Sequence, residues 1–91
     1  MKAQKLTSIQ NPKVKFAFRL RDRKSRDEEK LTLLEGYREL TRAHEYGMSI
    51  TEAYFCPDMF LGENEFPLLE KLEKSGAAIY EVTPQVLNKI A

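Results

Sequence analysis

The amino-acid sequence predicts an α/β protein, in which helices cover both faces of a small, largely parallel sheet to form a three-layer α/β/α sandwich. Two observations favour this class. Short apolar runs typical of strands alternate with segments of helical periodicity, and Asn-Pro or Thr-Pro steps open the first and last of those segments. A helix between two strands usually connects parallel neighbours, so this alternation places helices on both faces of one sheet.

The N-terminal third is expected to contain one helix and one strand. Residues 1–10 are predicted as an extended arm. A helix follows from about Pro12 to Lys24, because Asn11 is a favoured cap and proline suits the first helical position. Residues 25–30 then form a polar turn, and the apolar run Leu31–Glu35 predicts the first strand.

The same alternation continues to the C-terminus. Gly47 and Gly76 each follow a helical segment at the position where glycine commonly ends a helix. The remaining predicted elements are, in order, a helix over residues 37–46, a strand over 53–56, a helix capped by Asn64, a strand over 78–82 and a helix from Thr83-Pro84 through Ile90. Because the chain stops in or just after this last helix, we expect it to be part of a longer protein.

The charges are strongly segregated along the chain. Residues 1–26 hold nine basic residues and one acidic residue, a net +8, whereas residues 27–91 hold six basic and thirteen acidic residues, a net −7. The overall charge of +1 hides this polarity. A concentrated positive field on an otherwise acidic chain points to a polyanionic partner, and nucleic acid is the first candidate.

Four of these basic residues form a predicted stripe on the first helix. Lys15, Arg19, Arg23 and Arg26 follow a spacing of about one helical turn, so they are expected on one face. A solvated helix face is the ordinary interpretation of such a stripe, but the segregated charge favours contact with phosphates. Lys13 lies at the edge of the apolar arc, so its stem is expected to flank this arc, and it is a further candidate for nucleic-acid contact.

Four other residues are candidates for nucleic-acid contact. Asn11 lies at a helix N-terminus, where backbone N–H groups favour an anion, although capping alone would explain an asparagine there. Ser8 could reach a sugar or phosphate from the arm. Gly36 precedes a predicted helix, where a glycine permits either an unusual backbone angle or the close approach of a nucleic-acid backbone. Tyr37, the next residue, could stack on a base.

No pattern in the sequence predicts catalysis or a metal site. His44 has no neighbouring ligand residue, and Cys56 is the only cysteine, so it cannot form an internal disulfide. The carboxylates fall on predicted turns and exposed helix faces. No apolar run is long enough to span a membrane and no secretory signal is present, so a cytoplasmic location without membrane contact is expected.

Three segments taken together resemble a known family. They are Thr7-Ser-Ile-Gln-Asn-Pro-Lys-Val-Lys15, Arg26-Asp-Glu-Glu-Lys and Leu31-Thr-Leu-Leu-Glu-Gly36. In this order and spacing they are similar to the N-terminal substrate-binding domain of the SpoU (TrmH-type) RNA 2′-O-ribose methyltransferases. The likeness continues through the Tyr54-Phe55 strand and the Tyr80-Glu-Val strand, and so covers nearly the whole chain. Thr32 departs from the family, which more often has a bulky apolar residue there.

The resemblance implies a fold akin to small RNA-binding ribosomal proteins. It also implies that residues 1–91 form a single RNA substrate-binding domain, with a basic arm and first helix over 1–26 and an α/β core over 27–91. Its partner would be a structured rRNA or tRNA. The fragment would bind no cofactor and would be a monomer. S-adenosylmethionine binding, catalysis and homodimerisation would belong to a further domain of the full-length enzyme.

A second function remains open at this point. The basic pole could dock an acidic protein partner, which would make the chain a protein-interaction module instead of an RNA-binding one. Direct competition by ribosomal or transfer RNA would separate the two hypotheses. A free-standing enzyme would need a methyl-donor site, and the sequence contains no glycine-rich nucleotide fingerprint.

Overall fold

Three parallel strands form the middle layer of the molecule in the computed structural model, which describes residues 1–91. They are β1 (Ala3–Leu6), β2 (Glu52–Phe55) and β3 (Ala78–Val82). The order in the sheet is β1-β3-β2, so β3 is the central strand and pairs with both neighbours. The all-parallel arrangement confirms the predicted sheet.

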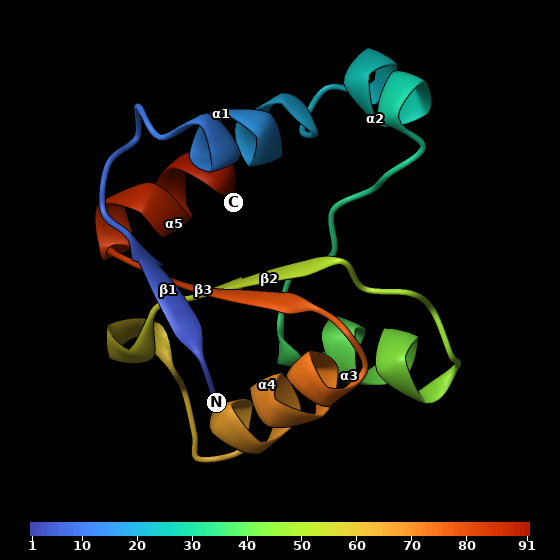
Figure 1. Cartoon of the computed structure of the whole chain (residues 1–91), viewed down its shortest axis with the longest axis vertical. Coiled ribbons are helices and arrows are strands. Elements are labelled where there is room, and N and C mark those ends of the chain that lie inside the picture. The colour runs from blue at the N-terminus through green and yellow to red at the C-terminus, as the bar shows by residue number, and fades with distance from the viewer.

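Helices cover both faces of this sheet, as Figure 1 shows. α1 (Pro12–Arg19) and α5 (Pro84–Ile90) lie on one face, and α3 (Tyr37–Glu45) and α4 (Glu65–Lys74) lie on the other. The predicted three-layer α/β/α sandwich is therefore confirmed. Two short elements complete the chain: α2 (Arg23–Glu29), and a single 3₁₀ turn, η1 (Pro57–Met59).

One of the three predicted strands is wrong. Leu31–Glu35 has no strand structure, and its place in the three-stranded sheet is taken by β1 in the segment predicted as an arm. Leu6 of β1 is buried, whereas Leu33 is 38% exposed. An apolar run becomes a strand only where it finds a partner edge, and the open edge of β3 pairs with β1.

The first predicted helix is also wrong in extent. Instead of one helix over residues 12–24, the chain forms α1 and α2, joined by a turn in which Asp22 is the N-cap of α2. The Asp22 carboxylate accepts a hydrogen bond from the Ser25 N–H at 3.4 Å. This cap starts a new helix, which extends into the segment 25–30 that was predicted as a turn.

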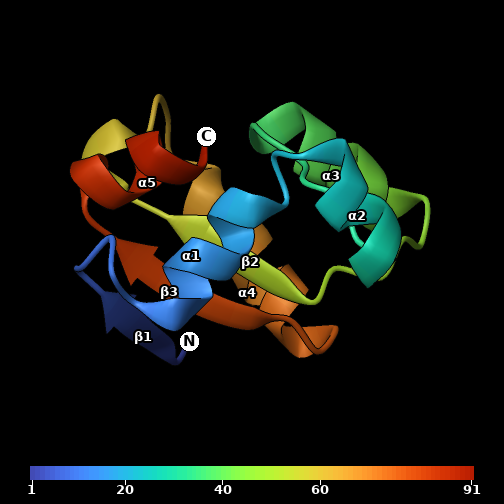
Figure 2. The ribbon, with the colours of Figure 1, turned by 90° about the horizontal axis from the view of Figure 1, so that it is seen from above.

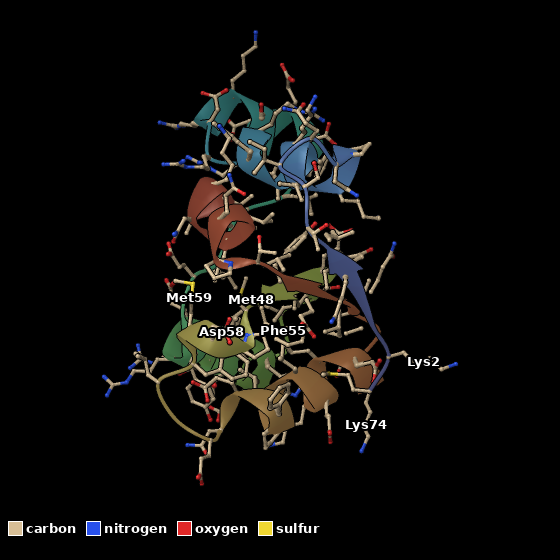
Figure 3. The ribbon with its side chains drawn as sticks, turned by 90° about the vertical axis from the view of Figure 1, so that its left-hand side faces the viewer. Lys2, Met48, Phe55, Asp58, Met59 and Lys74 are labelled. Atoms are coloured by element: carbon tan, nitrogen blue, oxygen red, sulfur yellow. The ribbon has the colours of Figure 1, made fainter.

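Two hydrophobic clusters hold the layers together. The first joins β1 and β3 to α1 and α5, and its most buried members are Val14 and Val86. The second joins β2 and β3 to α4 around Leu72, and Phe55 there stacks with Phe60 at 5.9 Å between ring centroids. Figure 3 shows Phe55 on the side of the sheet that faces α4. No helix of the structure combines the length and apolar character needed to cross a bilayer.

Candidate nucleic-acid interface

The loop between β1 and α1 is a compact turn that two of the predicted contact residues build. The Asn11 Oδ1 accepts a hydrogen bond from the Lys13 N–H at 2.9 Å, which caps α1. The Ser8 Oγ accepts one from the Gln10 N–H at 3.0 Å, and the Ser8 carbonyl accepts one from the Asn11 N–H at 3.1 Å. These bonds account for both side chains structurally, and RNA contact by Ser8 and Asn11 stays a prediction.

Lys15 and Arg19 are the two stripe residues that keep the predicted arrangement. Both are exposed, they lie four residues apart on α1, and neither forms an ion pair. The Arg19 guanidinium lies 5.4 Å from the centroid of the Phe16 ring, which holds it against the helix. These two cations are therefore available to an anion on the outer face of α1.

The stripe does not continue onto Arg23 and Arg26, because the helix ends between them and Arg19. Arg26 turns back and caps α1: its Nη1 donates to the Leu20 carbonyl at 2.9 Å and to the Arg21 carbonyl at 2.7 Å. Arg23 pairs with Asp27 at 3.9 Å, and both side chains are exposed. The prediction of one continuous stripe is wrong. Arg26 instead caps the C-terminal end of α1, a role that the local sequence does not indicate.

Lys13 faces the sheet instead of the outer surface of α1. Its Nζ lies 3.5 Å from the Glu52 Oε2 and 5.2 Å from the centroid of the Tyr80 ring. The interaction with the Tyr80 hydroxyl, followed by the charge of Glu52, raises the pKa of Lys13 above its ordinary value. Lys13 thus ties α1 to β2 and β3 and is partly neutralised there.

A polar network continues from Lys13 across the sheet. The Tyr54 hydroxyl donates to the Glu52 Oε1 at 3.1 Å, and the Tyr54 and Tyr80 rings stack with their centroids 5.2 Å apart. Burial, and then the neighbouring Glu52 carboxylate, raise the pKa of the Tyr54 hydroxyl above its ordinary value. Tyr54 therefore stays a neutral donor to Glu52, and this carboxylate is held by one lysine and one tyrosine.

Gly36 and Tyr37 begin α3, which lies on the opposite face of the sheet from α1 (Figure 1). Gly36 has a backbone φ of +98°, which residues other than glycine rarely adopt. A Cβ atom added at this position would have no other atom within 4 Å. The backbone angle therefore explains this glycine better than a close approach does. Tyr37 is 40% exposed and remains a candidate for stacking. The structure thus splits the predicted contact residues into two groups.

α3 carries a basic pair that was not among the predicted contact residues. Arg38 and Arg42 are exposed, lie one helical turn apart and form no ion pair. The signal was present in the spacing of the helix predicted over residues 37–46. Residues 27–91 contain more acidic than basic residues, so the net charge of this segment does not reveal the two arginines.

Comparison with known proteins identifies the class of this domain. The family profile of the MRM3-like substrate binding domain matches residues 11–91, and the chain belongs to this family. This confirms the resemblance to the substrate-binding domain of SpoU-type methyltransferases. No curated protein sequence gives a significant match.

Solved structures give the same assignment. The chain is similar to the rRNA methyltransferase of Sinorhizobium meliloti, with a TM-score of 0.81 and 26% identity over 99% of this chain. A second structure, the AdoMet-bound rRNA methyltransferase from the same organism, has a TM-score of 0.81 and 26% identity over 97% of this chain. The match spans 32% and 31% of those chains, about a third of their length. The protein is a substrate-binding domain homologous to that of an rRNA methyltransferase.

Proposed function

We propose that this domain binds structured RNA and holds it for 2′-O-ribose methylation by a catalytic domain of the same enzyme. The observation that carries the proposal is the basic outer face of α1, where Lys15 and Arg19 lack carboxylate partners on a domain of the methyltransferase family. A helix that presents unpaired cations attracts the phosphates of RNA. It recognises the shape and the sugar–phosphate backbone of the RNA and not its base sequence.

The context of the domain is part of this proposal. The similar chains are about three times as long, which supports residues 1–91 acting as one domain of a longer methyltransferase. AdoMet is bound in one of those structures, so S-adenosylmethionine is the expected methyl donor of the rest of the enzyme. We further propose that the isolated domain is a monomer, that homodimerisation belongs to the rest of the enzyme, and that the enzyme works in the cytoplasm.

The substrate class is proposed as rRNA, with tRNA as the alternative. Both similar structures are rRNA methyltransferases, which supports rRNA. Titration of the domain with labelled rRNA stem–loops and with bulk tRNA at several salt concentrations tests the choice. Tighter binding of an rRNA stem–loop supports rRNA, and tighter binding of tRNA reverses the assignment.

A double variant tests the interface itself. Lys15→Gln/Arg19→Gln should weaken RNA binding by about tenfold or more, and should make the plot of log affinity against log salt shallower by about 0.7–0.9 for each phosphate that is no longer neutralised. The control is Lys71→Gln/Lys74→Gln, which removes the same charge from exposed positions on α4. Equal effects of the two variants would show that only net charge matters.

The competing hypothesis of an acidic protein partner predicts a different result. Polyglutamate carries dense negative charge without sugar, base or RNA shape. If polyglutamate displaces rRNA stem–loops as well as unlabelled RNA does at equal charge concentration, the domain is a general polyanion binder and the proposed RNA function is wrong. Selective competition by RNA supports the proposal.

A further inference from the structure

The C-terminal ends of α1 and α5 meet at one aromatic ring that holds two cations. The Lys89 Nζ lies 4.1 Å from the centroid of the Phe18 ring, and the Arg21 Cζ lies 5.5 Å from the same centroid. The Arg21 Nη1 also donates to the backbone carbonyl of Lys89 at 3.3 Å, a contact between residues 68 positions apart. Figure 2 shows α1 and α5 side by side in the same layer.

No carboxylate neutralises this pair. The ion pairs of the structure involve Lys5, Lys13 and Arg23, and none involves Arg21 or Lys89. The nearest acidic residue in the sequence is Asp22, whose carboxylate accepts the Ser25 N–H and caps α2. Both cations are exposed, so their charged ends remain open to a ligand.

The ring of Phe18 brings the two positive charges together. Both lie within 5.5 Å of one ring centroid, so they are at most about 10 Å apart, roughly one Debye length at 0.1 M salt. Phe18 is partly buried and packs against the first hydrophobic cluster, so the ring is fixed and brings both cations together. Two exposed cations on one fixed ring, neither paired with a carboxylate, favour a negatively charged ligand.

A simpler interpretation is that both cations serve the helices. Arg21 and Lys89 lie at the C-terminal ends of α1 and α5, where the negative end of the helix dipole favours positive charge. The two interpretations differ in what they predict for RNA binding. If the cations serve only the helix ends, their removal lowers the thermal midpoint and leaves the RNA affinity unchanged. If they also hold a phosphate of the ligand, their removal weakens RNA binding as well.

We propose that Arg21 and Lys89, held on Phe18, form a phosphate-binding site that takes a backbone phosphate of the RNA. The inference rests on the proposed function and extends the contact surface from α1 to α5. The guanidinium of Arg21 offers two parallel donors to phosphate oxygens, and the ammonium of Lys89 adds a point charge from the other helix. The site joins residues from the two ends of the sequence, so it exists only in the folded domain.

The variant Arg21→Gln/Lys89→Gln tests the site. We expect weaker binding of rRNA stem–loops, by about tenfold, and a salt dependence shallower by about 1.4–1.8, which corresponds to the removal of two neutralising cations at 0.7–0.9 each. Affinities should be compared at a temperature at which both proteins are folded, because the variant also loses the contacts with Phe18 and the Arg21 hydrogen bond to the Lys89 carbonyl. The control Lys71→Gln/Lys74→Gln removes the same charge from α4; Figure 3 shows Lys74 on the far side of the sheet from α1 and α5.

A second variant removes the ring and keeps both charges. Phe18→Leu retains an apolar side chain against the cluster but removes the aromatic face that holds Arg21 and Lys89. Weaker RNA binding by this variant, with the salt dependence unchanged, supports the role of the ring in placing the charges. Unchanged RNA affinity of both this variant and the double variant overturns the proposed site.

Titration with inorganic pyrophosphate, followed by NMR signals of the Arg21 and Lys89 side chains, separates this inference from the proposed function. Shifts at these two residues without any RNA binding would support an anion site and overturn the RNA function. RNA binding that the double variant retains in full, with no pyrophosphate shifts, would overturn the site and leave the RNA function standing. A fall in the thermal midpoint of the double variant with unchanged RNA affinity would favour the helix-end role and overturn the site.

Discussion

α1 and α2 are neighbours in the sequence and both are rich in lysine and arginine, but the fold holds them in different ways. α1 buries Val14 completely and Ala17 almost completely in the first hydrophobic cluster. α2 buries no residue at all. Figure 1 shows α1 lying over the sheet beside α5, whereas α2 lies beyond it.

The difference shows that basic residues on neighbouring helices need not serve the same purpose. Cations on α1 are carried by a helix with a buried face, so their positions are defined before any ligand binds, and a defined position reduces the entropy lost on binding. α2 carries no net charge, because its three basic residues are balanced by Asp27, Glu28 and Glu29, and the helix is held by capping contacts alone. We therefore propose that α1, and not α2, makes the positional contacts with RNA. Variants of the two helices test this comparison.

The largest expected effect comes from the anchor of α1. Val14→Ala removes two buried methyl groups and leaves a cavity. The substitution should therefore lower the free energy of unfolding by about 2 kcal/mol. Lys24→Ala on α2 is the control and should change it by less than about 0.5 kcal/mol, because that side chain is exposed. Urea denaturation measures both values. Similar losses from the two variants would show that α2 is anchored as firmly as α1.

An intermediate effect is expected from the contact that holds α2 to α1. Arg26→Ala leaves the Leu20 and Arg21 carbonyls without their donor and should cost about 1 kcal/mol. Amide hydrogen exchange should become faster in α2 and stay unchanged in the middle of α1. Arg23→Ala, which removes only the exposed pair with Asp27, is the control and should have little effect. Unaltered exchange in α2 of the Arg26 variant would mean that another contact holds this helix.

The smallest effect concerns the end of α2, where Lys30 adopts a left-handed backbone with φ 58°. Lys30→Gly should stabilise the domain by about 0.5 kcal/mol, since the left-handed cost of roughly 1–2 kcal/mol is relieved and is partly offset by the greater entropy of glycine when unfolded. Lys24→Gly, inside the helix, should instead destabilise by about 1 kcal/mol. Thermal unfolding monitored by circular dichroism would detect both. A destabilising Lys30→Gly would contradict the backbone assignment at this residue.

Much of the fold could be predicted because its signals are local. Asn11 and Thr83 each accept a backbone N–H as helix caps, followed by a proline, and these steps open α1 and α5 where they were predicted. The strand predicted over residues 78–82 is β3. Such signals depend on residues within one turn of each other, so a single sequence contains the information needed to recognise them.

The candidate interface could be predicted only in outline. The segregation of charge pointed to the N-terminal segment, and Lys15 and Arg19 have the exposed, unpaired arrangement that was expected. Lys13 and Arg26 were assigned to RNA on the same pattern, but the structure places Lys13 against Glu52 and Arg26 against two carbonyl groups. A charge count cannot distinguish these cases, because the partner that occupies a cation is distant in sequence or lies across a turn.

Local signals were enough to establish the class of fold, the helix starts at prolines and the basic character of the first 26 residues, because composition, capping and periodicity act over a few residues. Long-range packing established that Ala3–Leu6 and not Leu31–Glu35 pairs with the sheet, and that Arg21 and Lys89 meet on Phe18. Strand pairing and the meeting of α1 with α5 depend on which distant segments bury their apolar faces together. That choice is made by the packing of the whole chain, so no local pattern reveals it.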